Sequence, residues 1–260
     1  MEVTKFIDLI NTISPEENAL KWDNGGIQIL FRDKPLEKVL IALDVTEGVI
    51  EEALHMGADL ILTHHPLFFA PINKIDDKEY ISKLIIKLVQ NKISLYSAHT
   101  SFDNLNGGNN DYLCKMLEIY DTYDVNVDNK ELIGKIGYFE KSFKLNEIIG
   151  KIKNKLRISE KLNVVFNDDK LVRKVAVCSG SGSSLVQLAL ENECDLLITG
   201  DINYHTALEA IGKGLKIIDI THYHSEKIFI NNLSELIKAN LNEKLSIVQC
   251  KLDQNPFHMI

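Results

Sequence analysis

The 260-residue sequence lacks several features that would assign it to a specialised class of protein. It contains no run of about 18 apolar residues, so we expect no membrane-spanning helix. Basic residues are in the minority, 29 against 37 acidic ones, and the net charge of -8 disfavours a broad nucleic-acid surface, which needs clustered positive charge. The opening segment, residues 1–5, lacks the charged and then apolar pattern of a secretion signal.

Cysteine is also scarce. The four cysteines are Cys114, Cys178, Cys194 and Cys250, and none belongs to a Cys-x-x-Cys pair. This pattern favours reduced thiols over a disulfide framework, and we therefore expect a cytoplasmic protein.

The first half of the chain alternates between the patterns of strands and helices. Apolar runs predict strands at residues 27–31, 39–44, 60–63 and 94–98, and helical spacing predicts helices at residues 2–12, 46–56 and 78–90. A second helix is expected from Pro15 toward Trp22, because Ser14 is a suitable cap and acidic residues follow the proline. This alternation predicts an α/β fold with a largely parallel sheet.

Two adjacent histidines, His64 and His65, follow the strand predicted at residues 60–63. In open α/β sheets, ligands bind beyond the carboxyl ends of the strands. Imidazoles at such a position can bind a metal, move protons or hold an anion. The alternative is a pair of polar loop residues, and for an isolated His-His pair that alternative is favoured.

The second half of the chain repeats the plan of the first. The segment from Cys194 to Asp201 lies over residues 58–65, and the segment from Lys216 to Glu226 lies over residues 93–103. We interpret this as an internal duplication that yields two similar three-layer α/β lobes, with a metal site in the cleft between them. The lobes are expected at residues 1–125 and 126–260, with the final helix and strand, about residues 227–260, packing back on the first lobe. Chance resemblance between two βαβ units is the competing explanation.

Two such lobes facing each other would bring four strand ends together. Those ends carry His64, His65, Asp103, His222 and Glu226. Imidazoles and carboxylates suit zinc, iron, manganese or nickel, and a carboxylate can bridge two ions. Two metal ions about 3.5–4 Å apart form a known hydrolytic arrangement. A His-x-x-x-Glu spacing alone is a weak signal, because on a helix it is often a surface pair.

Six blocks of sequence strengthen this interpretation. They are Trp22-Asp23-Asn24-Gly25-Gly26-Ile27-Gln28, Leu43-Asp44-Val45-Thr46, Thr63-His64-His65-Pro66-Leu67, Ala98-His99-Thr100-Ser101-Phe102-Asp103, Thr199-Gly200-Asp201 and Thr221-His222-Tyr223-His224-Ser225-Glu226. With these blocks in order from about residue 20 to 230, the chain resembles the family of dinuclear-metal-centre hexameric proteins, also labelled GTP cyclohydrolase I type 2 homologues or NIF-three-like proteins.

The resemblance implies two similar α/β lobes, a two-metal site in the cleft between them and a toroidal homohexamer. It implies that His64, His65, Asp103, His222 and Glu226 are the metal ligands, with Asp103 and Glu226 as the bridging candidates. Many family members carry an additional domain between the two halves, and this chain resembles the compact form.

Other residues have more than one interpretation. His99 overlays His222 and is either a sixth ligand, a buried structural histidine or, as we prefer, a group that transfers protons or orients a ligand. His205, beside Tyr204, is a second candidate for proton transfer. Asp201 replaces His65 in the repeat and could hold a histidine or a substrate.

The predicted function is a hydrolase that uses two divalent metal ions to act on a nucleotide-like or phosphorylated small molecule. The alternative is a non-catalytic protein that binds the same metals for storage, trafficking or regulatory scaffolding. A nucleic-acid clamp is a third possibility, and the acidic composition disfavours it.

Overall fold

The computed structural model describes residues 1–125, 133–166 and 168–257, which form two compact units. Unit 1 comprises residues 1–105 and 229–254, and unit 2 comprises residues 106–228 and 255–257. The predicted lobe boundary after residue 125 adjoins residues 126–132, which lie outside the described part of the chain, and it stays a prediction.

Unit 1 is built on a five-stranded sheet with the strand order β1-β4-β3-β2-β11. All neighbouring strands are parallel except β1, which runs antiparallel to β4. The elements are α1 (Val3–Ile13), η1 (Glu16–Asn18), β1 (Gly26–Ile29), β2 (Lys38–Ala42), α2 (Glu47–Met56), β3 (Leu60–Thr63), α3 (Tyr80–Gln90), β4 (Ser94–Ser97), α4 (Thr100–Asp103), α10 (Ile228–Asn240) and β11 (Ser246–Gln249).

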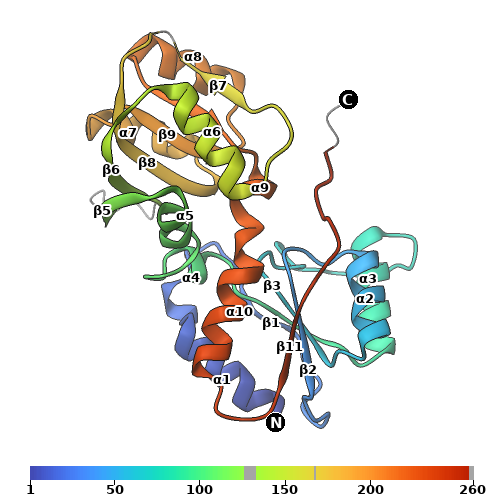
Figure 1. The fold of residues 1–260 in the computed structure, drawn as a ribbon. Coiled ribbons are helices and arrows are strands. Elements are labelled where there is room, and N and C mark those ends of the chain that lie inside the picture. Colours follow the sequence, from blue (N-terminus) through green and yellow to red (C-terminus); the bar gives the residue numbers. More distant parts are fainter. Residues whose placement is uncertain (126–132, 167, 258–260) are drawn as a thin grey trace. The chain divides into compact units, whose positions relative to one another are not determined.

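Helices cover both faces of this sheet, so unit 1 has three layers (Figure 1). Leu40 and Ile61 face α2 and α3, in a core with Val49, Ile50 and Leu88. The helices α1 and α10 lie on the other face. Because alternate residues of a strand point to opposite faces, a strand covered on both sides must be apolar throughout.

Local signals define α2. Thr46 caps its amino end by accepting a hydrogen bond from the Val49 amide, and Gly57 ends it in the left-handed conformation with φ 66°. This short connection delivers the chain to β3, whose four residues are all buried.

Unit 2 contains a six-stranded mixed sheet with the order β5-β6-β8-β9-β10-β7. Only β8, β9 and β10 are parallel to one another. The elements are α5 (Asn109–Leu117), β5 (Ile119–Asp124), β6 (Lys135–Phe143), α6 (Leu145–Leu156), β7 (Asn163–Val165), β8 (Val172–Ser181), η2 (Ser183–Leu185), α7 (Val186–Glu191), β9 (Leu196–Gly200), α8 (Tyr204–Lys213), β10 (Lys216–Asp219) and α9 (His222–Glu226).

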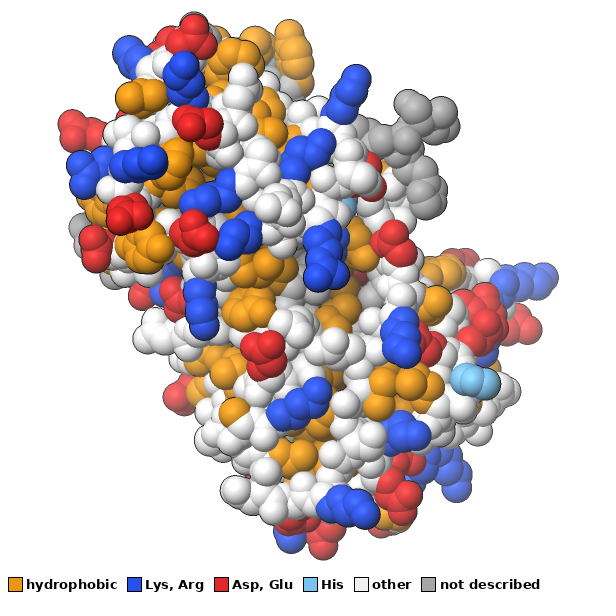
Figure 2. Space-filling view, in the orientation of Figure 1, with side chains coloured by type: hydrophobic (Ala, Val, Ile, Leu, Met, Phe, Trp, Pro, Cys, Tyr) orange, Lys and Arg blue, Asp and Glu red, His pale blue; other side chains and the backbone are white. Residues whose placement is uncertain are grey.

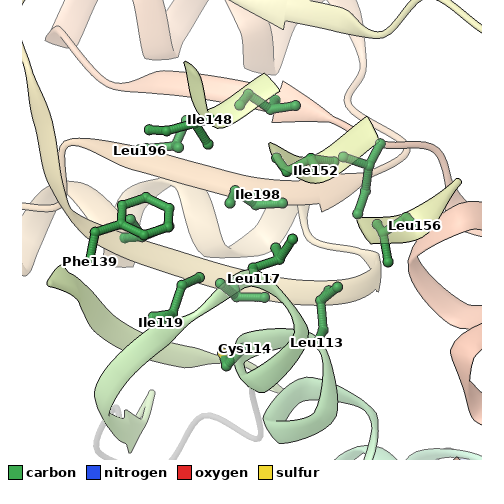
Figure 3. Packing of buried hydrophobic residues seen from close by; sticks show 14 of the residues in the cluster. Leu113, Cys114, Leu117, Ile119, Phe139, Ile148, Ile152, Leu156, Leu196 and Ile198 are labelled. Carbon is green, nitrogen blue, oxygen red and sulfur yellow. The ribbon is translucent and has the colours of Figure 1, made fainter. Parts of the chain in front are cut away.

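The strand β8 shows why unit 2 also has three layers. Val175 and Val177 pack into a core with α5 and α6, part of which is drawn in Figure 3. Ala176 and Cys178, which alternate with them, pack into a second core with α7 and α8. Buried apolar area on both faces therefore fixes the central strands.

The predicted mixed α/β fold with two sheets is confirmed. The helix expected from Pro15 toward Trp22 is wrong, since only η1 forms there and Ala19 is already extended. Contacts distant in sequence explain the difference: the Leu20 amide donates to Thr100 Oγ1 at 2.9 Å, and the Asp23 carboxylate accepts from the Thr100 amide at 3.0 Å.

None of the helices in the described ranges is both long and apolar enough to cross a membrane. Figure 2 shows one face of the molecule, on which Lys and Arg side chains are interspersed with acidic and apolar ones. This face offers no continuous basic patch of the kind that binds nucleic acid.

Candidate metal centre

Three histidines and an aspartate gather at the carboxyl ends of β3 and β4. We call His64, His65, His99 and Asp103 the unit 1 cluster. One ligand nitrogen from each histidine lies within 4.8 Å of those of the other two. His64, His99 and Asp103 are buried, and His65 is half-buried. A group of three imidazoles this close could hold a metal ion.

Hydrogen bonds at the ends of β2 and β3 fix the backbone that carries His64 and His65. Both histidine amides donate to the Leu43 carbonyl, at 3.2 and 3.1 Å. Thr63 Oγ1 donates to the His65 carbonyl at 2.8 Å, and the Gln254 side chain accepts from the Leu43 amide at 3.0 Å. None of these bonds uses an imidazole nitrogen, so they position the two histidines and leave the ring nitrogens to other contacts.

Each histidine of the unit 1 cluster directs Nδ1 at an oxygen atom. The partners are the Ala98 carbonyl for His64 (3.0 Å), Asp44 Oδ1 for His65 (2.8 Å) and Asp23 Oδ1 for His99 (2.8 Å). Carbonyls and ionised carboxylates only accept hydrogen bonds, so Nδ1 carries the proton in each ring. In the neutral imidazole, Nε2 then carries the lone pair that a metal ion or a proton requires.

Asp103 completes this cluster from the short helix α4. Its Oδ2 lies 3.5 Å from Nε2 of His64. Two ligands of one tetrahedral ion with bonds of about 2 Å are separated by roughly 3.3 Å. The pair therefore has a spacing that suits two ligands of a shared cation.

The Asp23 carboxylate that holds His99 is kept ionised. Burial raises its pKa, but hydrogen bonds from His99 and Thr100 outweigh burial and lower the pKa to about 2. Asp23 is therefore negatively charged at neutral pH, which fixes the proton on Nδ1 of His99.

Unit 2 contributes a second group of candidate ligands, at the carboxyl ends of β9 and β10. His222 and Glu226, four residues apart on α9, place Nε2 and Oε2 at 2.9 Å, and we call them the unit 2 pair. Nδ1 of His222 lies 2.6 Å from Oδ2 of Asp201. This histidine thus follows the pattern of the unit 1 cluster, with Nδ1 held by an oxygen acceptor.

Two glycines make room for the unit 2 pair. Gly180 has φ +70°, and a Cβ atom there would lie 2.3 Å from Oε1 of Glu226. A Cβ atom on Gly200 would lie 2.6 Å from the His222 amide nitrogen. The absence of a side chain at Gly180 and Gly200 therefore lets β8 and β9 pass close to α9.

Two residues that flank His222, one in contact with it and one before it in sequence, have strained backbone conformations. Asp201 has φ 55° and Thr221 has φ 65°, both in the left-handed region that costs non-glycine residues energy. Thr221 Oγ1 offsets this cost in part by capping α9 through the His224 amide.

His205 and His224 belong to neither the unit 1 cluster nor the unit 2 pair. His205 is exposed on the first turn of α8, with its ring 5.4 Å from that of Tyr204. His224 is buried, and its Nδ1 lies 2.9 Å from Thr221 Oγ1.

Sequence reasoning missed the two carboxylates that hold His65 and His99. Asp44 and Asp23 belong to the sequence blocks quoted above, but nothing in the linear order connects them to histidines far along the chain. Asp201 was expected to hold a histidine or a substrate, and the structure pairs it with His222. A carboxylate that follows the carboxyl end of a strand is the signal that could have indicated Asp44 and Asp201, whereas Asp23 precedes β1 and carries no such signal.

The five predicted ligands divide between the units. His64, His65 and Asp103 belong to unit 1, and His222 and Glu226 belong to unit 2. Each unit by itself therefore carries only part of the predicted set of ligands.

Comparisons with known proteins cover almost the whole chain. The model of the family Duf34/NIF3 (NGG1p interacting factor 3) matches residues 1–256. A Clostridium perfringens protein named GTP cyclohydrolase 1 type 2 homolog is 36% identical over 100% of both chains. The solved structure of a Bacillus cereus protein related to NIF3 has a TM-score of 0.90 at 25% identity, covering 100% of this chain and 99% of that one. Reduced HcgD from Methanocaldococcus jannaschii has a TM-score of 0.83 at 32% identity, covering 97% and 98%.

Proposed function

The chain belongs to the Duf34/NIF3 family, and from that premise we propose that it binds two divalent metal ions and uses them to hydrolyse a nucleotide-like or phosphorylated small molecule. The proposed ligands are His64, His65, Asp103, His222 and Glu226. The zinc, iron, manganese or nickel ions would lie in a cleft between the two lobes, with Asp103 and Glu226 as bridging carboxylates.

One observation carries the metal site. His64, His65, His99 and His222 all have Nδ1 engaged with an oxygen acceptor, so Nε2 is the nitrogen that each ring would offer to a metal ion. Metal-binding histidines in proteins are commonly oriented in this way, by a carbonyl or a carboxylate on the second nitrogen. Four histidines in this state, accompanied by two buried carboxylates, suit divalent transition metals.

The metal ions would supply two effects: they would lower the pKa of water and stabilise negative charge on the substrate's oxygen atoms. The chain's own residues would then orient the ions and manage protons. The names of the curated relatives, GTP cyclohydrolase 1 type 2 homolog, support a nucleotide-like substrate.

We assign proton transfer to His99. Its Nδ1 donates to Asp23, so Nε2 can accept a proton from water. The ionised Asp23 carboxylate would then stabilise the imidazolium that forms. His205 is the second candidate, and its exposed position on α8 would require the substrate to reach it.

Family membership also supports a homohexameric toroid and a cytoplasmic location. The four cysteines are buried thiols that form no disulfide within the described residues, which agrees with a reducing compartment. Light scattering on the purified protein tests the assembly: the proposal requires six times the chain mass of 29.4 kDa.

Metal analysis tests the centre. We expect two ions per chain in protein purified without added metal, as measured by elemental analysis and by anomalous diffraction. His64→Ala and His222→Ala should each lose metal, because each removes a ligand. His55→Ala is the matched control, since His55 is exposed near the end of α2. Full metal content in both ligand variants would refute the site.

Activity is tested separately on metal-loaded protein with a panel of phosphoesters and nucleotides. The hydrolase assignment predicts turnover that disappears in Glu226→Gln and falls in His99→Gln, with the His55→Ala control unchanged. Two bound ions without turnover of any compound would favour the non-catalytic metal-binding alternative.

A further inference from the structure

A large pocket in unit 1 lies beside the unit 1 cluster and is not explained by metal binding. It has a volume of about 890 Å³ and is lined by residues that include Trp22, Asn24, Phe69, Ile72, Lys74 and Ile75. A volume of this size suits a ligand as large as a nucleoside monophosphate. The lining comes from two segments, one before β1 and one in the loop between β3 and α3.

Aromatic side chains in the pocket are unusually exposed. Trp22 is 62% exposed and Phe69 is 60% exposed. Each ring lies 5.9 Å from the His99 ring, centroid to centroid, at interplanar angles of 74° and 90°. The rings of Trp22 and Phe69 therefore flank His99, to which we assign proton transfer, and the ring faces are accessible to a planar ligand.

Side-chain hydrogen bonds hold the segments that carry Trp22 and Phe69 in place. Both polar groups of the Phe68 backbone form hydrogen bonds. The carbonyl accepts from Asn24 Nδ2 at 2.5 Å, and the amide donates to Gln28 Oε1 at 3.1 Å. Gln28 Nε2 also donates to the Asn24 carbonyl at 2.7 Å. The loop carrying Phe69 is thus fastened to the segment carrying Trp22, so the pocket is formed in advance of binding.

The charges in the pocket favour an anionic ligand. Lys74 is exposed and makes no ion pair with any residue in the described ranges. The pocket's carboxylate, Asp23, is already occupied by His99 and Thr100. The free positive charge is therefore the one that a ligand would meet.

We propose that this pocket binds a planar aromatic heterocycle that carries an anionic group, with the ring between Trp22 and Phe69 and the negative charge at Lys74. None of Trp22, Phe69 and Lys74 is a proposed metal ligand, so binding in this pocket does not depend on the metal centre. The inference rests on the proposed function only where it identifies the bound ligand as the substrate. It assigns a ligand-binding role to Trp22.

Trp22 is the only tryptophan in the sequence, so its fluorescence reports on this pocket directly. The probes are adenosine monophosphate, guanosine monophosphate, the two nucleosides and ribose phosphate, each titrated into metal-free and metal-loaded protein. We expect saturable quenching by the nucleotides, weaker quenching by the nucleosides and none by ribose phosphate, because only a ring can stack.

Two variants with matched controls locate the binding. Phe69→Leu should weaken nucleotide and nucleoside binding by roughly 5-fold or more, because base–aromatic stacking is lost. Lys74→Gln should weaken nucleotide binding by about 5-fold and leave nucleoside binding unchanged. Phe166→Leu, at an exposed phenylalanine of unit 2, and Lys78→Gln, in the same loop as Lys74, should change neither.

Three outcomes would overturn the inference. The first is an absence of saturable quenching by every nucleotide in both metal states. The second is quenching that Phe69→Leu and Lys74→Gln leave unchanged. The third is shielding of Trp22 from acrylamide that grows with protein concentration, which would show that a second copy of the chain covers the pocket. Quenching in metal-free protein stays readable even if no metal binds, so failure of the proposed function and failure of this inference are distinguishable.

Discussion

Units 1 and 2 use the same polar contacts at the amino ends of their central strands. In unit 1, Asp59 Oδ2 accepts from the amides of Glu37 and Lys38, at 2.8 and 3.1 Å. In unit 2, Asp195 Oδ2 accepts from the two amides that precede Val175, both at 2.9 Å. The lysine at the start of each central strand, Lys38 in β2 and Lys174 in β8, donates to a carbonyl near the end of the following helix.

The carboxyl ends of the same strands differ. Unit 1 presents His64 and His65 after β3, whereas unit 2 has Gly200 as the last residue of β9 and Asp201 directly after it. The difference teaches that backbone hydrogen bonding constrains one edge of the sheet in both units, while the opposite edge is free to carry different chemistry.

The strand registers refine the overlay made from the sequence. Leu196 and Leu60 correspond to each other in the sequence overlay. Lys216 pairs with Leu196 in unit 2, and Ser94 pairs with Leu60 in unit 1. Lys216 therefore corresponds to Ser94, whereas the sequence overlay had placed it on residue 93. Unit 2 therefore has one additional residue before its site histidine. Thr221, with φ 65°, is the strained residue at that point.

The largest effect is expected from Gly180→Ala, which tests whether the position of Glu226 in unit 2 depends on the absence of a side chain at residue 180. The new Cβ atom would lie 2.3 Å from Glu226 Oε1 at a backbone φ of +70°, so the carboxylate must move. We expect metal affinity to fall at least tenfold by calorimetric titration, as when groups around metal ligands are altered.

Gly150→Ala is the control for that change. Gly150 lies in α6 with no other atom within 4 Å of a new Cβ, and helix propensity predicts a gain in stability of about 1 kcal/mol with unchanged metal binding. Equal metal affinity in both alanine variants would contradict the proposed role of Glu226.

A second comparison concerns the carboxylates that hold the histidines. Asp44→Asn in unit 1 and Asp201→Asn in unit 2 remove the charge beside His65 and His222 while keeping side-chain size. Each should lower metal affinity by roughly 10- to 100-fold, because the histidine loses its orienting acceptor. Titration with zinc measures both. A loss in only one variant would show that one unit binds metal without the other.

The shared contacts at the amino edge should have similar energetic value in both units. Asp59→Ala and Asp195→Ala should each lower the free energy of unfolding by about 1–3 kcal/mol, because two amides lose their acceptor. Asp59→Ala should be the more damaging, since Asp59 also forms an ion pair with Lys34 at 2.9 Å. Urea denaturation measures both values, and a negligible effect of either variant would break the comparison.

The smallest effect is expected from acid titration of a surface network in unit 2. Hydrogen bonds from Lys151 and Lys155 lower the pKa of Glu118 from 4.5 to about 2. A lowered folded-state pKa stabilises the protein above the unfolded value, and this stabilisation is lost as the pH falls from 4.5 toward 2. Glu118→Gln should therefore flatten the loss of stability in that range. An unchanged pH profile would contradict this role.

The alternation of strands and helices was readable from the sequence because apolar periodicity depends on local burial. The strand at residues 60–63 was predicted with the bounds that the structure has. Local capping signals such as Thr46 and Gly57 agree with the tertiary packing at α2. Where the local signal was overruled, at residues 15–22, hydrogen bonds to Thr100 decided the outcome.

The sequence by itself determined which chemical groups stand at the strand ends, since His64, His65, His99 and Asp103 follow apolar runs that must be buried. Only the tertiary structure decided which nitrogen of each histidine is available, because Asp23, Asp44 and Asp201 reach their partners through folding. It also decided that the segments of Trp22 and Phe69 enclose one pocket. The physical reason is that side-chain character is set residue by residue, whereas hydrogen-bond partners distant in sequence are chosen only when strands and loops pack together.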